Sequence, residues 1–146
     1  MANLNPFVLC SRTITAVLSD VLVTEGQSTA GVSQTFWDNF AGVNGLTIVA
    51  DFDWGSGGTT AILAVDTAFG SGGDWYPCAR FDFAQADAVK HLVISRTGIV
   101  AAANLVTALG ADEARNLIGD RFRARLTTTG VYAGGTLIDV RAQPHQ

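Results

Sequence analysis

Residues 46–54 read Leu-Thr-Ile-Val-Ala-Asp-Phe-Asp-Trp, and every second residue of this stretch is apolar. Its two aspartates, Asp51 and Asp53, lie between the apolar positions, which are Leu46, Ile48, Ala50, Phe52 and Trp54. Side chains of a β-strand alternate between its two faces. The stretch therefore predicts a strand with one face in a core and the other toward solvent.

The same alternation recurs at residues 60–66, 79–83, 91–94, 121–126 and 138–142. Glycine-rich turns at residues 55–58, 70–73 and 134–135 separate several of these runs. Short strands with turn signals at this spacing predict an all-β fold, an antiparallel β-sandwich that is jelly-roll-like. We expect residues 13–146 to form this single domain and residues 1–12 to form an extended N-terminal arm.

Two segments depart from strand periodicity and predict one or two short helices. In residues 33–40, Phe36 and Phe40 are four positions apart, which is a helical spacing. Residues 99–118 are ambiguous, and within them residues 111–117 place acidic residues before Arg115, in the order that suits a helix dipole.

The chain carries little charge for a small domain. Of its 146 residues, 15% are charged and 48% are hydrophobic, whereas about 25% charged residues is usual. Large apolar surfaces commonly mark contact sites, so the composition favours a component of an assembly. A net charge of −4 argues against a nucleic-acid partner. No run reaches the roughly 20 apolar residues of a membrane span, so no membrane partner is expected.

No motif indicates catalysis, a cofactor or a metal. The two histidines, His91 and His145, belong to no triad pattern, and Cys10 and Cys78 are far apart with no metal-ligand spacing. We therefore expect no catalytic, cofactor-binding or metal-binding residues.

Asp51 and Asp53, followed by Gly55, faintly resemble an acidic calcium loop that Asp66 or Asp74 would have to complete. The more ordinary interpretation of these two aspartates is an acidic strand end that pairs with an arginine.

The sharpest electrostatic feature is a stripe of three arginines, Arg121, Arg123 and Arg125, at alternate positions of one predicted strand. Three like charges on one strand face need partners. One interpretation is pairing within the chain, with Asp139, Asp82 or Asp51. The other is an ion-pair ladder between subunits, which makes the three arginines candidate interface residues.

Trp75 and Tyr76 follow a glycine loop and are the remaining candidate interface residues. Packing in the core or between subunits is one interpretation. The other is a platform for a sugar ring, which would make the protein a sugar-binding β-sandwich module.

Two blocks resemble small structural proteins of tailed bacteriophages and gene-transfer-agent-like particles. Residues 60–83 contain Asp-Thr-Ala-Phe, a glycine-rich turn, a tryptophan and Ala-Arg-Phe-Asp-Phe, similar to the pattern T-S-x-D-G-G-x-x-W-x-D-I-A-x-F-x-F. Residues 119–136 are similar to G-D-R-x-R-x-x-x-x-T-T-G-x-Y-x-G-G-T. The first turn is longer here, and Pro77-Cys78 stand where a more regular strand start is usual.

This resemblance implies a virion structural protein on a jelly-roll-like sandwich. The expectation is a capsid decoration, or cement, protein that is made in the host cytoplasm and lies on the capsid surface. Its partners would be the major capsid protein and further copies of itself, with a trimer favoured. A tail or neck component is the alternative within the particle.

Overall fold

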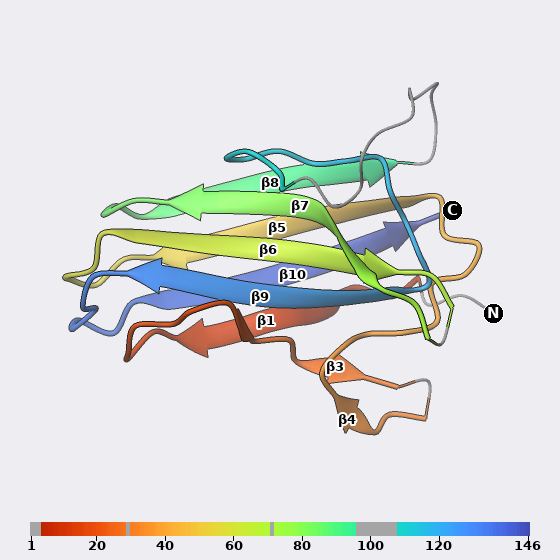
Figure 1. Cartoon of the computed structure of the whole chain (residues 1–146), viewed down its shortest axis with the longest axis horizontal. Helices are drawn as coiled ribbons and strands as arrows, with labels where there is room; N and C mark the ends of the chain where they lie inside the picture. Colours follow the sequence, from red (N-terminus) through yellow and green to blue (C-terminus); the bar gives the residue numbers. More distant parts are fainter. Residues whose placement is uncertain (1–3, 29, 71, 96–107) are drawn as a thin grey trace.

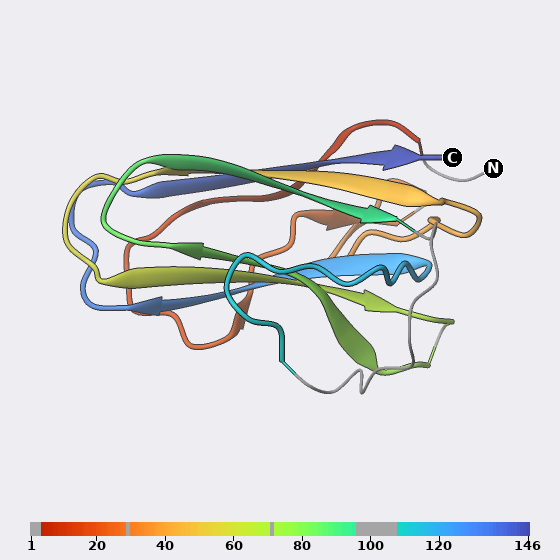
Figure 2. The same ribbon diagram turned by 90° about the horizontal axis from the view of Figure 1, so that it is seen from above.

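The chain folds into two four-stranded antiparallel β-sheets that lie face to face as two layers (Figures 1 and 2). The structure is a computed structural model that describes residues 4–28, 30–70, 72–95 and 108–146. Sheet A has the strand order β1 (Phe7–Thr13), β10 (Leu137–His145), β5 (Gly45–Asp53) and β8 (Ala88–Ser95). Sheet B has the order β2 (Val21–Leu22), β9 (Arg121–Thr129), β6 (Thr60–Ala68) and β7 (Trp75–Phe83). A separate small hairpin consists of β3 (Gly26–Gln27) and β4 (Ser33–Gln34).

The strand order is that of a jelly roll. With the β3–β4 hairpin set aside and the strands renumbered along the chain, sheet A has the order 1-8-3-6 and sheet B has the order 2-7-4-5. Most strands that follow each other in sequence, such as β9 and β10, therefore lie in opposite sheets, whereas β6 and β7 are neighbours in sheet B. Two interleaved Greek keys of this kind define the double-sheet jelly roll, which confirms the predicted all-β sandwich.

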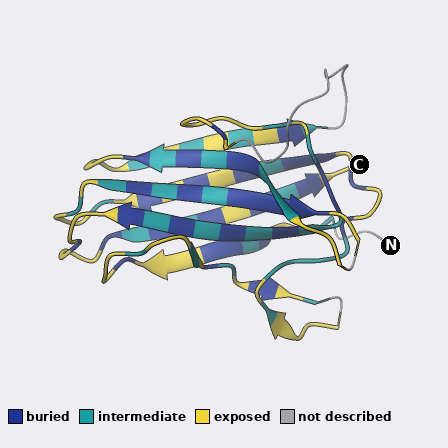
Figure 3. Cartoon of the chain, viewed as in Figure 1, coloured by how far each residue is buried: buried dark blue, intermediate teal, exposed yellow. Residues whose placement is uncertain are grey.

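The core lies between the two sheets and consists of the apolar positions of the alternating runs. Figure 3 shows buried residues alternating with intermediate or exposed residues along the strands. In β5 the completely buried residues are Leu46, Ile48, Ala50 and Phe52. The ring of Phe52 stacks on Phe83 of the opposite sheet, with centroids 4.7 Å apart. Burial of this face removes apolar area from water, which is the main favourable term in folding.

Residues 7–12 of the predicted N-terminal arm belong to an edge strand of the sandwich. Phe7–Thr13 is β1, which pairs with β10 along its length. Leu9 and Cys10 are completely buried. The boundary expected after residue 12 therefore divides a strand of the sandwich rather than an arm from a domain.

The helix prediction for residues 33–40 is wrong. Ser33–Gln34 is β4, and Trp37 forms an isolated β-bridge with Phe122. The backbone N–H of Trp37 donates to the carbonyl of Phe122 at 2.8 Å, and the N–H of Phe122 donates back at 2.9 Å. These bonds to the start of β9 hold the segment extended, so tertiary pairing overrides its local helical spacing.

The helix predicted at residues 111–117 is also absent, and the described residues contain no helix. Ala114 forms a bridge with Ala79 on the free edge of β7. The N–H of Arg80 donates to Glu113 O and the N–H of Arg115 donates to Cys78 O, each at 2.9 Å. Covering the edge of sheet B uses the backbone groups that a helix would need. Residues 99–107 of the ambiguous segment lie outside the described residues.

Cys10 and Cys78 do not meet. Each is a buried free thiol, Cys10 on β1 of sheet A and Cys78 on β7 of sheet B. The Cys78 thiol donates to the carbonyl oxygen of Val65 at 3.3 Å. Both behave as small core residues.

Candidate interaction surface

The arginine stripe lies on the outer face of sheet B. Along β9 the residues between the arginines point into the core and are completely buried: Phe122, Ala124 and Leu126. Arg123 is directly opposite Asp66 on β6, and Arg125 is opposite Ala64. The strand register therefore brings an aspartate of the neighbouring strand into the stripe.

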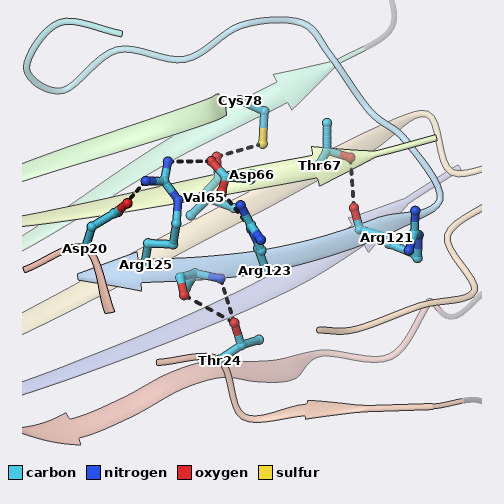
Figure 4. A network of polar contacts seen from close by, with 10 residues as sticks. Asp20, Thr24, Val65, Asp66, Thr67, Cys78, Arg121, Arg123 and Arg125 are labelled. Carbon is cyan, nitrogen blue, oxygen red and sulfur yellow. Dashed lines mark hydrogen bonds and ion pairs between the residues drawn. The ribbon is translucent and has the colours of Figure 1, made fainter. Parts of the chain in front are cut away.

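Asp66 is the centre of an ion-pair network with two of these arginines. It is only 1% exposed. Nε of Arg123 donates to its carboxylate at 2.9 Å, and Arg125 donates through Nε and a terminal nitrogen at 2.6 and 2.9 Å. Figure 4 shows Asp66 between the two guanidinium groups, with Asp20 bound to the far side of Arg125. The hydrogen bond to Asp66 raises the pKa of Arg125 above its ordinary value, so this guanidinium group stays charged.

Pairing within the chain is thus confirmed for Arg123 and Arg125, but the predicted partners are wrong. Asp139 on β10 and Asp51 on β5 lie on sheet A, whereas the arginines lie on β9 of sheet B. Asp82 is on β7 of sheet B but pairs with Arg80, with Nε 2.6 Å from the carboxylate. The sequence signal for Asp66 is a lone aspartate within an otherwise uncharged strand.

Trp75 belongs to the same cluster as the arginines. The guanidinium carbons of Arg121 and Arg123 lie 5.2 and 4.6 Å from its ring centroid, and the ring of Phe36 is 5.9 Å away. Arg121 also donates to the carbonyl of Gly70. Contacts of this kind are cation–π interactions, and they already occupy part of the ring surface that a sugar would use.

Tyr76 is separate from this cluster. Its ring faces Phe69, with centroids 6.4 Å apart, and Phe69 is an exposed aromatic side chain. The structure therefore brings Trp75 and the three arginines together but leaves Tyr76 with a different neighbour.

The outer face of sheet A has a different chemistry. Three of its valines are exposed: Val49 on β5 by 39%, and Val89 and Val93 on β8 by 69% and 55%. In the register, Val49 lies between Arg141 and His91, and Asp51 lies between Asp139 and Val89. Apolar and acidic side chains are thus mixed on one sheet face.

A hollow of about 530 Å³ lies on this face. Its charged lining residues are Asp51, Asp53, Asp87, Asp139 and Arg141. Arg141 pairs with Asp139 at 3.2 Å, and Asp87 accepts a bond from the backbone N–H of Trp54 at 2.8 Å. In the described part of the chain, the side chains of Asp51 and Asp53 have no hydrogen-bond or ion-pair partner. Among the described residues, the expected arginine partner for this acidic strand end is therefore missing.

Neither Asp66 nor Asp74 joins Asp51 and Asp53 to complete the calcium loop that was one interpretation of the sequence. Asp66 is held by two arginines on the opposite sheet, and Asp74 is not among the residues that line the hollow. Across the described residues, no group of three or more histidine, cysteine or acidic side chains is arranged to hold a metal ion.

The second block behind the phage resemblance makes structural contacts between loops. Thr128 and Thr127 accept bonds from the backbone N–H groups of Leu18 and Asp20 at 2.9 and 3.1 Å. The hydroxyl of Thr136 accepts from the N–H of Gly55 at 3.0 Å. Gly134 packs directly on Gly55, so that a Cβ on residue 55 would overlap the carbonyl oxygen of Gly134. These residues hold one end of the sandwich together.

The described ranges contain no helix that is long and apolar enough to cross a membrane. Comparison with known proteins finds no matching family model, no matching curated sequence and no matching solved structure.

Proposed function

We propose that the protein is a non-enzymatic structural component of a virion, a capsid decoration or cement protein that binds and stabilises a phage head shell. Three observations support this proposal. The fold is a jelly-roll sandwich, the chain carries little charge, and residues 60–83 and 119–136 resemble small phage structural proteins.

The observation that carries the proposal is the contrast between the two outer sheet faces. On sheet B, Arg123 and Arg125 are neutralised within the chain by Asp66. On sheet A, exposed valines border aspartates that have no partner in the described residues. A face with both apolar area and unused charge is the kind of surface that binds another protein.

Binding to a shell would stabilise it by mass action, because a protein that binds only the assembled state shifts the equilibrium toward that state. Many copies on one lattice add their effects. Symmetric oligomers are the rule, and a trimer of this chain would match a local threefold axis. The proposed partners are therefore the major capsid protein and further copies of the chain, on the capsid surface.

The test uses particles that lack this protein. We expect them to lose density from the outside of the head and to break at lower temperature or under milder osmotic shock than complete particles. Adding the purified protein back should restore both properties. Unchanged stability with no density lost from the shell would refute the cement function.

The alternative within the particle is a tail or neck component, which the same resemblance supports. Copy number distinguishes the two. A lattice protein is present in hundreds of copies, whereas a ring on the tail axis holds roughly six or twelve.

A further inference from the structure

The outer face of sheet A indicates the chemistry of the partner. We propose that this face docks onto a protein surface whose arginine or lysine side chains enter the acidic hollow, while Val49 and Val89 contact the partner's apolar groups. The inference deepens the proposed function and rests on it, because it specifies which surface of the shell protein the decoration protein would recognise.

The first argument is the distribution of charge. Four aspartates and one arginine line the hollow, which leaves it a net charge of −3. The whole chain has a net charge of −4. Most of the excess negative charge is therefore on one sheet face. A surface of opposite sign is attracted to such a face and is oriented by it as it approaches.

The second argument is the pairing of like charges. Asp51 on β5 and Asp139 on β10 are directly opposite each other in the register. Like charges in this position destabilise a sheet. Within the described ranges, Arg141 binds Asp139, at 3.2 Å, and not Asp51. A guanidinium from outside that reached both carboxylates would remove this repulsion, and the fork of arginine suits such carboxylate contacts.

The third argument is the apolar border of the hollow. Val49 and Val89 both line it, and Val93 lies further along the same face of β8, beyond His91. Burial of these side chains would add a hydrophobic contribution to the charge pairing. Arginine is enriched in specific protein interfaces, and complementary charges across an interface favour the correct partner and its orientation.

A second copy of this chain is a poor occupant for the hollow. In a twofold dimer the same patch meets itself, so two faces of charge −3 would be placed against each other. The arginines that a copy could offer from sheet B already have acidic partners: Arg123 and Arg125 pair with Asp66, Arg121 with Asp120, and Arg80 with Asp82. The occupant is therefore a different protein with a basic surface.

The test measures binding of the purified protein to head shells assembled without it, by co-sedimentation. Asp51→Asn/Asp53→Asn removes two charges from the hollow, and Asp38→Asn/Asp74→Asn removes two charges elsewhere as the matched control. We expect the hollow variant to bind about tenfold more weakly and the control to bind like wild type. Raising the salt concentration from about 0.05 M to about 0.5 M should weaken wild-type binding most, because it screens exposed charges.

A melting curve of the isolated protein excludes misfolding as the cause. Removing the Asp51 charge relieves the repulsion with Asp139, so the hollow variant should melt at the same temperature as wild type or higher. A variant that is at least as stable but binds the shell poorly supports docking through this face.

The failures are distinguishable. If the wild-type protein does not bind shells, the proposed function fails, and this inference fails with it. If the hollow variant and the control variant both bind shells like wild type, the hollow is not the docking site, but the proposed cement function stands. The inference is also overturned if calcium raises the melting temperature of wild type but not of the hollow variant, or if the isolated protein dimerises through this face.

Discussion

Arg125 on β9 binds Asp66 on β6 with two hydrogen bonds, at 2.6 and 2.9 Å, on the outer face of a jelly-roll sandwich. The carboxylate is almost fully buried beneath the arginine side chains. This pair, together with Arg123, ties the central strands of sheet B to each other by side chains as well as by backbone bonds.

Loss of Asp66 should destabilise the protein strongly. Asp66→Ala leaves the partly buried guanidinium group of Arg123 without its counter-ion and that of Arg125 with only the exposed Asp20, and we expect the free energy of unfolding to fall by about 3 kcal/mol. Urea denaturation at neutral pH measures the change. Asp20→Asn is the control, because it removes the exposed charge that binds the same Arg125 while asparagine still tolerates the positive φ of 52° at this position, and it should cost less than about 1 kcal/mol. Equal effects of the two substitutions would show that the buried network is not a main support of sheet B.

The contact between Gly55 and Gly134 should tolerate no side chain. A Cβ at Gly55 would overlap the carbonyl oxygen of Gly134, whereas nothing lies within 4 Å of a Cβ at Gly72. We expect Gly55→Ala to lower the free energy of unfolding by about 3 kcal/mol, as overpacking does. Gly72→Ala should leave the melting temperature almost unchanged. A Gly55→Ala protein as stable as wild type would contradict the close approach of the two loops.

Trp75 should act as part of the arginine cluster. Trp75→Ala removes the ring that Arg121 and Arg123 contact, and we expect a loss of about 2 kcal/mol in thermal or urea unfolding. Tyr76→Ala removes the neighbouring aromatic ring, which contacts Phe69 instead, and should cost less. A glycan array probed with the wild-type protein tests the sugar-binding alternative, and we expect no binding that depends on Trp75.

Alkaline pH should destabilise the fold through its two thiols. Burial raises the pKa of Cys10 from 9.0 to about 12 and also raises the pKa of Cys78. Both thiols then keep their protons in the folded state at pH values where the unfolded chain loses them. The stabilisation that the two protonated thiols give the folded state is fully present below pH 9. As the pH rises toward 12, the free energy of unfolding falls by about 1.4 kcal/mol per pH unit for each thiol.

The measurement for the thiols is the free energy of unfolding at several pH values between 9 and 12. The Cys10→Ala/Cys78→Ala variant, even if less stable at neutral pH, should lose stability more slowly over this range. If the free energy of unfolding falls equally with pH in the variant and the wild type, burial does not raise the pKa values of the two thiols.

The sequence predicted the strand faces well because alternation is a local property. The buried set of residues 46–54 and the arginine face of β9 both follow from period two alone. The helix predictions failed where backbone groups pair with distant strands, as Trp37 does with Phe122. Local spacing carries no information about such pairing.

The partners of the charged residues were harder to predict, because they depend on which strands are neighbours. Asp139 follows the arginine stripe in sequence but lies in the opposite sheet. Asp66 reaches Arg123 only through the register of β6 against β9. In the same way, the acidic hollow exists because β10 places Asp139 beside Asp51. The topology of the jelly roll, and not the order of residues, brings these groups together.

The central claim is that this chain binds a shell through the outer face of sheet A. Electron cryo-microscopy of purified particles, at a resolution that separates the two sheets, tests it most directly. The account predicts jelly-roll density on the head with Val49, Val89 and Asp51 turned toward basic residues of the shell protein. Particles without this density, or density in which sheet A faces solvent and sheet B contacts the shell, would contradict it.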